Sequence, residues 1–160
     1  LMESIRLIGR SGHSSDPSLG NNALEGMHEL ISRLLDLRSR LQQRFRNEAF
    51  AVAVPTLNLG HIHGGDNPNR ICGSCELHID LRFLPGMELG ELRGQIRELA
   101  RALADERGLT LEMESLFRGV PAMHTPDDSD LNRYLQEITE RRSRAVAFGT
   151  EAPFYNDMGC

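Results

Sequence analysis

Aromatic side chains are scarce in this sequence, and tryptophan is absent. Phe and Tyr together make up only 5% of the 160 residues, so any core must be aliphatic. Apolar residues still account for 39% of the chain and charged residues for 26%, which is typical of a globular rather than a disordered protein. This length suffices for one domain with a real core, or one domain and a small part of a second.

Long apolar runs and an excess of basic residues are also lacking. No stretch approaches the roughly 20 apolar residues that a membrane-spanning helix needs, so we expect no membrane partner. The formal net charge of -5 argues against a general nucleic-acid binder, which carries a clustered basic face. We therefore expect no nucleic-acid partner.

Cysteine is rare, and the three residues Cys72, Cys75 and Cys160 are an odd number. This count does not indicate a disulfide framework and favours reduced thiols in a cytoplasmic protein. The first residue lies directly in a strand-like run, and the last four residues form no tapering tail. Because natural termini usually lie in loose segments, we expect both ends to be interior positions of a longer protein.

Hydrophobic periodicity predicts a sheet and two helices in residues 1–118. Alternating polarity is typical of half-buried strands, and three-four spacing of apolar residues is typical of helices with one buried face. The expected strands cover 1–8, 57–63, 75–83 and 109–116, and the expected helices cover 24–41 and 89–103. Gly60 interrupts the second alternation, which predicts a bulge. The order βαββαβ predicts an α+β, ferredoxin-like fold: a four-stranded antiparallel sheet with two helices on one face.

The amino-acid composition of the sequence changes near residue 118. Residues 117–127 are rich in Gly, Pro and Asp, which indicates a linker. A third helix is expected over 131–138, and a short buried strand over 145–148. We therefore divide the chain into a first domain, 1–118, and a short α/β stub, 119–160, that belongs to a second domain.

One histidine lies where binding residues often occur. His13 is flanked by Gly12 and serines in a loop between a strand and a helix, and such loops frequently carry binding and catalytic residues. An exposed loop histidine without a role explains the same pattern.

A pair of cysteines and a pair of histidines suggest a zinc site. His61 and His63 end one hairpin strand, while Cys72 and Cys75 begin the next, and zinc accepts mixed Cys and His ligands. However, Cys72 and Cys75 are three residues apart and face opposite sides of a continuous strand. Packing of buried thiols is the alternative interpretation.

Three further segments could bind anions or polar groups. Arg82 lies on the polar face of its strand, where it can bind a carboxylate or pair with a neighbouring acid. Asn69 closes the preceding loop, where it can also serve simple turn chemistry. Gly149 and Thr150 follow the expected short strand and could present N–H groups and a hydroxyl to an anion.

Several strings taken together resemble a known family. They are Ser-Gly-His-Ser-Ser-Asp-Pro at 11–17, Pro-Thr-Leu-Asn-Leu-Gly-His-Ile-His-Gly-Gly-Asp at 55–66, Asn-Arg-Ile-Cys at 69–72, Cys-Glu-Leu-His at 75–78, Asp-Leu-Arg at 80–82, Leu-Pro-Gly-Met at 84–87 and Thr-Glu-Ala-Pro-Phe at 150–154. The chain is similar along nearly its whole length to the acetylornithine deacetylases. That family belongs to a clan of zinc-dependent amidohydrolases that also contains succinyl-diaminopimelate desuccinylase and the aminoacylases.

The resemblance implies an architecture and a reaction. Members of this family have a catalytic α/β domain with two zinc ions, or cobalt, and an inserted lid domain that pairs two subunits. They hydrolyse N2-acetyl-L-ornithine to L-ornithine and acetate in arginine biosynthesis. None of the family's metal ligands matches a position in this chain, so we expect no cofactor in it and an inactive isolated chain. The implied partners are a second subunit, bound through the lid sheet edge and a helix, and a small N-acyl amino acid.

The resemblance also implies roles for individual residues. His13 corresponds to a lid histidine that reaches the partner subunit's active site and stabilises the oxyanion. Asn69 and Arg82 match lid positions that contact substrate, Arg82 through the substrate carboxylate. Gly149 and Thr150 match a substrate loop of the catalytic domain, and Glu151 is expected to recognise the ornithine amine.

Two alternatives stay open at this point. One is a stand-alone dimerising ferredoxin-like interaction module, against which the segment 149–151 argues. The other is a small zinc-binding domain formed by the hairpin at 61–75.

Overall fold

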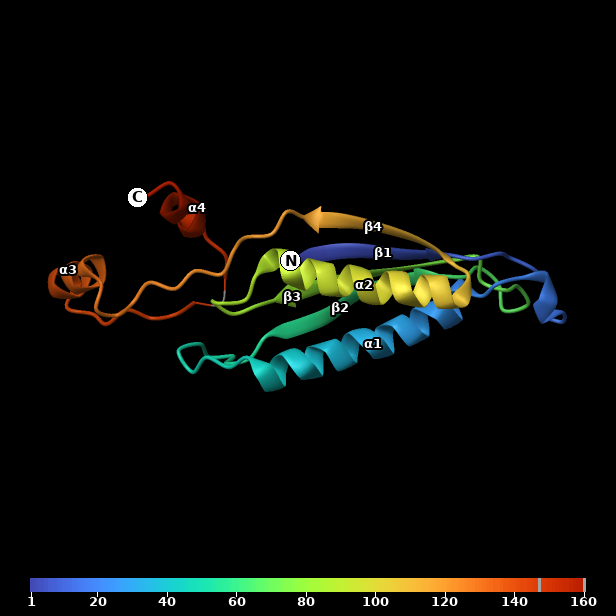
Figure 1. Ribbon diagram of the computed structural model, residues 1–160, viewed down its shortest axis with the longest axis horizontal. Coiled ribbons are helices and arrows are strands. Elements are labelled where there is room, and N and C mark those ends of the chain that lie inside the picture. Colours follow the sequence, from blue (N-terminus) through green and yellow to red (C-terminus); the bar gives the residue numbers. More distant parts are fainter. Residues whose placement is uncertain (147, 160) are drawn as a thin grey trace.

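A single antiparallel sheet forms the body of the molecule. The computed structural model describes residues 1–146 and 148–159, and its sheet contains β1 (Met2–Ile8), β2 (Thr56–Gly64), β3 (Ser74–Arg82) and β4 (Thr110–Phe117) in the order β2-β3-β1-β4. The helices α1 (Ala23–Arg44) and α2 (Leu89–Arg107) pack side by side on one face of this sheet (Figure 1). The ferredoxin-like α+β fold expected from the periodicity is thereby confirmed.

Local signals in the sequence set the ends of the two helices. The side chain of Asn22 caps α1 by accepting from the backbone N–H groups of Leu24 and Glu25. Helix α2 ends where Gly108 adopts the left-handed conformation with φ 60°, which glycine accepts without steric cost.

The core lies between the helices and the covered face of the sheet, and it is almost entirely aliphatic. Helix α1 contributes Met27, Leu30, Leu34 and Leu41 to it. The three-four spacing of apolar residues in the expected helix over 24–41 also includes Leu24, but this side chain is 44% exposed. Aliphatic residues of β1, β2, β3 and α2 and the buried cysteines Cys72 and Cys75 also belong to the core. Leu111 and Met113 of β4 are partly buried and pack against it.

The bulge expected at Gly60 is present between Leu59 and His61 in the pairing of β2 with β3. Because the bulge shifts the register by one residue, His61 and His63 lie on the open face of the sheet, opposite His78 and Glu76. Neither of the long helices α1 and α2 covers this face, because both pack on the opposite one.

The tail contains the expected third helix, α3 (Asp130–Thr139), and a short helix that was not expected, α4 (Ala152–Asp157). The expected strand over 145–148 is wrong for residues 145, 146 and 148, which are exposed and belong to no strand; residue 147 lies outside the described residues. An apolar run becomes a strand only beside a partner strand, and residues 145, 146 and 148 pair with none of the four strands described. Both helices lie beyond the end of the sheet at which β4 stops (Figure 1).

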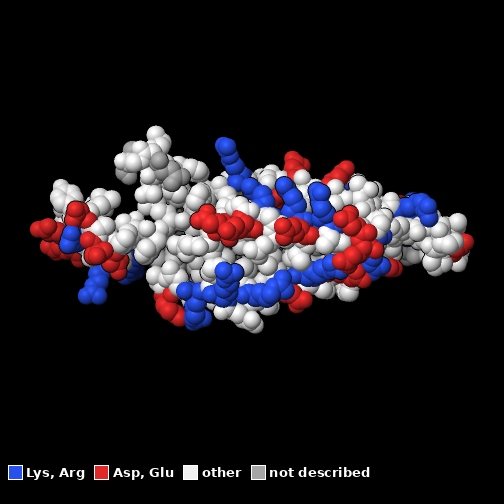
Figure 2. Space-filling model, in the orientation of Figure 1, with Lys and Arg blue, Asp and Glu red and all other residues white. Residues whose placement is uncertain are grey.

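Charges of both signs are mixed on the outer faces of the two long helices. Ion pairs join them, between Arg33 and Glu106 and between Arg107 and Glu29. Figure 2 shows Arg side chains interspersed with acidic ones on this side of the molecule. Among the helices of the described residues, none is long and apolar enough to span a bilayer.

Candidate functional site

The loop of His13 is joined to the loop of Asn69 by backbone hydrogen bonds. The N–H of Ser14 donates to the carbonyl of Asn69 at 2.9 Å, and the N–H of Ile71 donates to the carbonyl of Gly12 at 2.8 Å. Residues that are 56 positions apart in the sequence are therefore neighbours at one end of the sheet. Both belong to the set predicted from the sequence.

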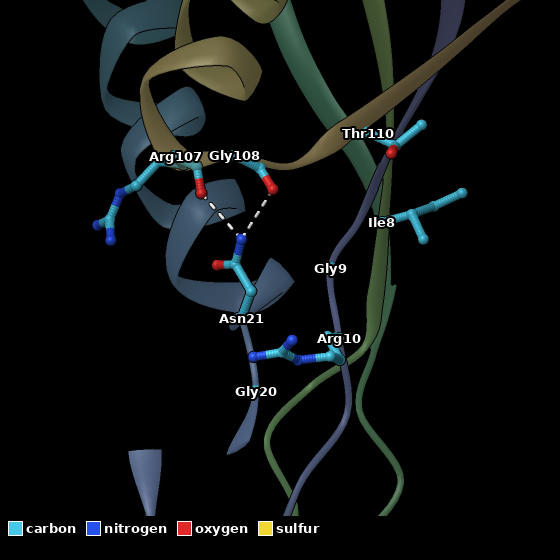
Figure 3. Close-up of a pocket in the computed structure, with 8 residues that line it drawn as sticks. All are labelled: Ile8, Gly9, Arg10, Gly20, Asn21, Arg107, Gly108 and Thr110. Carbon is cyan, nitrogen blue, oxygen red and sulfur yellow. Dashed lines mark hydrogen bonds between the residues drawn. The ribbon is translucent and has the colours of Figure 1, made fainter. Parts of the chain in front are cut away.

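The base of the His13 loop is anchored to the end of α2. Arg10 and Asn21 exchange two backbone hydrogen bonds of 3.0 and 2.8 Å, which close the loop. The side-chain amide of Asn21 donates to the carbonyls of Arg107 and Gly108 at 2.8 and 2.9 Å (Figure 3). These contacts hold the loop against the folded core. The hollow drawn in Figure 3 lies beside this anchor, and no predicted site residue lines it.

The ring of His13 is held from one side only. Its Nδ1 lies 2.7 Å from Oγ of Ser15, and the backbone N–H of Ser15 also donates to Nδ1 at 3.2 Å. The residue is exposed. Among the hydrogen bonds of the described residues, none involves Nε2 of His13, so this nitrogen is available to a ligand.

Arg82 lies at the opposite end of the sheet from His13. Strand β3 begins beside the His13 loop, where the N–H of Gly9 donates to the carbonyl of Gly73 at 2.9 Å. The strand covers nine residues, which at roughly 3.3 Å per residue separates its ends by about 26 Å. Arg82 therefore does not join His13 and Asn69 within one subunit.

The predicted residues of the tail lie past the Arg82 end. Strand β4 ends there, because Phe117 pairs with Met2 and Met2 pairs with Asp80. Gly149, Thr150 and Glu151 are exposed. The hydroxyl of Thr150 accepts from the N–H of Ala152, the first residue of α4, at 3.3 Å.

A charged cluster on the open face was missed by the sequence reasoning. Glu76 accepts from Arg6 at 2.6 Å and from Ser4 at 3.0 Å, and it lies 2.7 Å from Nε2 of His78. The hydrogen bond from Arg6, followed by those from His78 and Ser4, lowers the pKa of Glu76 to about 2. The ring of His61 lies 4.7 Å from that of His78. The polar alternation of β3 was the signal, but its partners on β1 were unknown.

The hairpin does not form the zinc site considered above. Cys75 points into the core, whereas His61 and His63 lie on the open face of the sheet. Burial raises the pKa of the Cys75 thiol to about 11, which disfavours the thiolate that zinc binds. Within residues 1–146 and 148–159, no group of three or more His, Cys, Asp or Glu side chains could hold a metal ion. The described part of the hairpin therefore does not bring the two cysteines and two histidines together as ligands.

Comparison with protein families gives one match that covers most of the folded body. Residues 2–108 match the model of the peptidase dimerisation domain. The chain is 46% identical over 158 residues to the acetylornithine deacetylases of Edwardsiella ictaluri and of Pectobacterium carotovorum subsp. carotovorum. These alignments cover 99% of the chain and 41% of each relative, so the chain spans about two fifths of their length.

Solved structures share the fold at low sequence identity. An aminohydrolase from methicillin-resistant Staphylococcus aureus superposes with a TM-score of 0.77 at 20% identity, over 98% of this chain and 40% of that protein. Aminopeptidase PepT from Bacillus cereus superposes with a TM-score of 0.71 at 16% identity, over 99% of this chain and 40% of that protein. At these identities the likeness supports the architecture alone.

Proposed function

Since this chain belongs to the peptidase dimerisation domain family, we propose that it is the lid and dimerisation part of a metal-dependent N-acetyl-L-ornithine deacetylase. The observation that carries the proposal is the 46% identity to acetylornithine deacetylases, which runs through both the sheet domain and the tail. In this proposal, residues 1–118 are the lid and residues 119–160 lead into the catalytic domain. The reaction is the hydrolysis of N2-acetyl-L-ornithine to L-ornithine and acetate, a step of arginine biosynthesis in the cytoplasm.

His13 supplies a hydrogen-bond donor to the oxyanion that forms when water attacks the amide. An exposed histidine on an anchored loop suits this role, because the donor is presented outward at a fixed position. Asn69, joined to the same loop, supplies a second polar contact to the substrate. Removing one oxyanion donor typically lowers the rate by about two to three powers of ten.

Arg82 binds the substrate carboxylate, and the tail contacts the other end of the substrate. The separation of about 26 Å along β3 supports an active site to which both subunits contribute residues. Arg82, Gly149, Thr150 and Glu151 serve the active site of their own subunit, whereas His13 and Asn69 reach that of the partner. Glu151 carries a carboxylate that would pair with the ornithine amine.

The metal chemistry lies outside this chain. Two zinc ions, or cobalt, would activate the attacking water, and their ligands would come from the part of the relatives' length that this chain does not span. The isolated chain is accordingly expected to be inactive.

The partner of the lid is a second copy of the same chain. Strand β2 is an edge strand with open hydrogen-bonding groups, and α1 packs beside it. On this edge Ile62 is 51% exposed. An edge strand with an adjacent helix is self-complementary about a two-fold axis, which suits a homodimer.

A chimera tests the function. The 158 aligned residues of this chain replace the corresponding segment of the Edwardsiella ictaluri acetylornithine deacetylase, and release of ornithine from N-acetylornithine is measured. We expect activity within about tenfold of the relative, and a loss of about 100-fold or more for His13→Ala. A soluble, dimeric chimera without deacetylase activity would overturn the proposal.

Mixing two inactive chimeras tests the action of His13 on the partner's site. One carries His13→Ala, and the other lacks the metal site of the catalytic domain. Random pairing through a two-fold interface should restore about a quarter of the full activity if His13 acts on the partner subunit. Action within one subunit predicts no recovery.

The alternative function is a stand-alone dimerising module without a link to catalysis. The exposed surface of α3, which buries none of its residues, speaks against it, because such a helix needs a further body to pack on. A chimera that dimerises but gives the same rate with and without His13 would favour this alternative.

A further inference from the structure

Ser15 makes two contacts with the same nitrogen of His13. Its hydroxyl oxygen lies 2.7 Å from Nδ1, and its backbone N–H donates to Nδ1 at 3.2 Å. A backbone N–H can only donate, so Nδ1 must offer a lone pair to it. The hydroxyl, which can donate or accept, then donates to the same lone pair.

These contacts decide the tautomer of the ring. A neutral imidazole has one protonated nitrogen, and the other accepts. Because Nδ1 accepts, the proton lies on Nε2, the nitrogen that faces away from Ser15.

The backbone of Ser15 is itself held in place. The N–H of Asp16 donates to the carbonyl of His13 at 3.1 Å, which closes a turn around Ser14 and Ser15. The side chain of Asp16 then accepts from the N–H and the hydroxyl of Ser18 at 3.1 and 2.6 Å, which anchors the turn to the short 3-10 helix Pro17–Leu19. The ring of His13 is therefore oriented by a rigid neighbour.

We propose that Ser15 is the positioning residue of the site: it orients the His13 ring and keeps the proton on Nε2, so that Nε2–H is the donor offered to a developing oxyanion. This inference rests on the proposed function for its catalytic meaning, but the tautomer is a property of this chain alone. The donor is thus set before substrate arrives, which removes the need to reorganise the ring during the reaction.

The tautomer is measured on the chain itself. Long-range proton–nitrogen correlation spectra of the 15N-labelled chain, recorded where imidazoles are neutral, distinguish protonated from unprotonated ring nitrogens; a His13→Gln variant assigns the signals. We expect Nε2–H to exceed Nδ1–H at His13 by more than about ten to one. His124, which is exposed in the tail, is the internal reference for a solvated ring.

Substitution of Ser15 is the second test of the proposal. Ser15→Ala removes the hydroxyl but keeps the backbone N–H, so it should lower the tautomer ratio of His13 part of the way toward that of His124. Ser15→Thr should keep the ratio high because the hydroxyl remains. In the chimera, Ser15→Ala should lower kcat by about three- to tenfold with KM unchanged, and Ser15→Thr should restore it. Ser32→Ala is the matched control, since its hydroxyl also makes one local hydrogen bond but lies on α1.

Each result decides one of the two hypotheses. A proton on Nδ1 of His13, or a ratio that does not respond to Ser15→Ala, overturns the role of Ser15. The role of Ser15 is also overturned if Ser32→Ala lowers kcat as much as Ser15→Ala does. If the chimera is inactive while the tautomer ratio behaves as expected, the proposed function is wrong but the positioning of the ring by Ser15 stands.

Discussion

The guanidinium Nε of Arg82 donates to Oδ2 of Asp80 at 2.8 Å. This contact uses the inner edge of the guanidinium and leaves its terminal amino groups available for a bidentate bond to a carboxylate. The other oxygen of Asp80, Oδ1, is buried and has no hydrogen-bond partner among the described residues. From the single contact at Nε we expect Asp80 to orient Arg82 on the open face of the sheet.

Substitution of this pair is expected to affect substrate binding rather than stability. In the chimera, Arg82→Ala should raise KM for N-acetylornithine by about 10- to 100-fold, because a charge-assisted bond is lost. Asp80→Asn should raise it less, since it only releases the orientation of Arg82. The exposed Arg101→Ala on α2 serves as the control. Unchanged KM in both variants would remove Arg82 from the substrate site.

The buried Glu3 is expected to be a large contributor to stability. It is fully buried, and it accepts from Nε of Arg93 and from the hydroxyl of Ser115, both at 2.9 Å. Glu3→Ala leaves Arg93 without its partner, which should lower the free energy of unfolding by about 2–3 kcal/mol; the partial exposure of Arg93 keeps the loss at this level.

Urea unfolding of the chain measures this loss. Glu112→Ala provides the control, because Glu112 is an exposed strand residue that lies 3.8 Å from Arg6, and its removal should cost less than about 0.5 kcal/mol. Similar losses in the two variants would contradict a special role for Glu3.

The cluster around Glu76 should make stability depend on acid pH. Its pKa is lowered from 4.5 to about 2, first by the hydrogen bond from Arg6. A carboxyl with a depressed pKa in the folded state stabilises the fold above its unfolded pKa and loses this effect as the pH falls. The contribution should therefore be complete above about pH 4.5 and disappear towards pH 2.

A series of urea titrations between pH 7 and pH 2 tests this dependence. The difference in unfolding free energy between the natural chain and Glu76→Gln should be largest at pH 7 and shrink below about pH 4.5. Glu114→Gln, a change at an exposed position of β4, should show no such trend. A difference that stays constant across this range would refute the assignment.

The two buried thiols should be inert in the folded chain. Burial raises the pKa of Cys75 to about 11, and Cys72 is also buried. At neutral pH fewer than about one Cys75 side chain in a thousand is then a thiolate, the reactive form. In a Cys160→Ser background, a thiol reagent should label neither residue under native conditions and both in denaturant. Rapid native labelling would show that the hairpin opens.

Much of the fold could be predicted because its signals are local. The alternation in β3 and the three-four spacing in α2 report which face of each element is buried, and the bulge at Gly60 is visible as a break in the alternation. The failures share a cause. The expected strand over 145–148 and the burial of Leu24 depend on what lies next to them, which periodicity does not report.

The candidate site could also be predicted from the sequence only in part. The sequence alone, through its resemblance, singled out His13, Asn69 and Arg82 as site residues, and their roles remain predictions. It did not indicate that Ser15 contacts Nδ1 of His13, because turn geometry sets that contact.

The sequence by itself determined the order of the elements and the chemical types available, since both follow from residue spacing and side-chain identity. Only the tertiary structure decided which of them meet. Backbone hydrogen bonds bring the loops of His13 and Asn69 together across 56 residues, and the length of β3 keeps Arg82 about 26 Å from them. Packing of α2 on the sheet also brings Arg93 to the buried Glu3, 90 residues earlier. Such long-range contacts depend on chain topology, which the local pattern of a sequence does not contain.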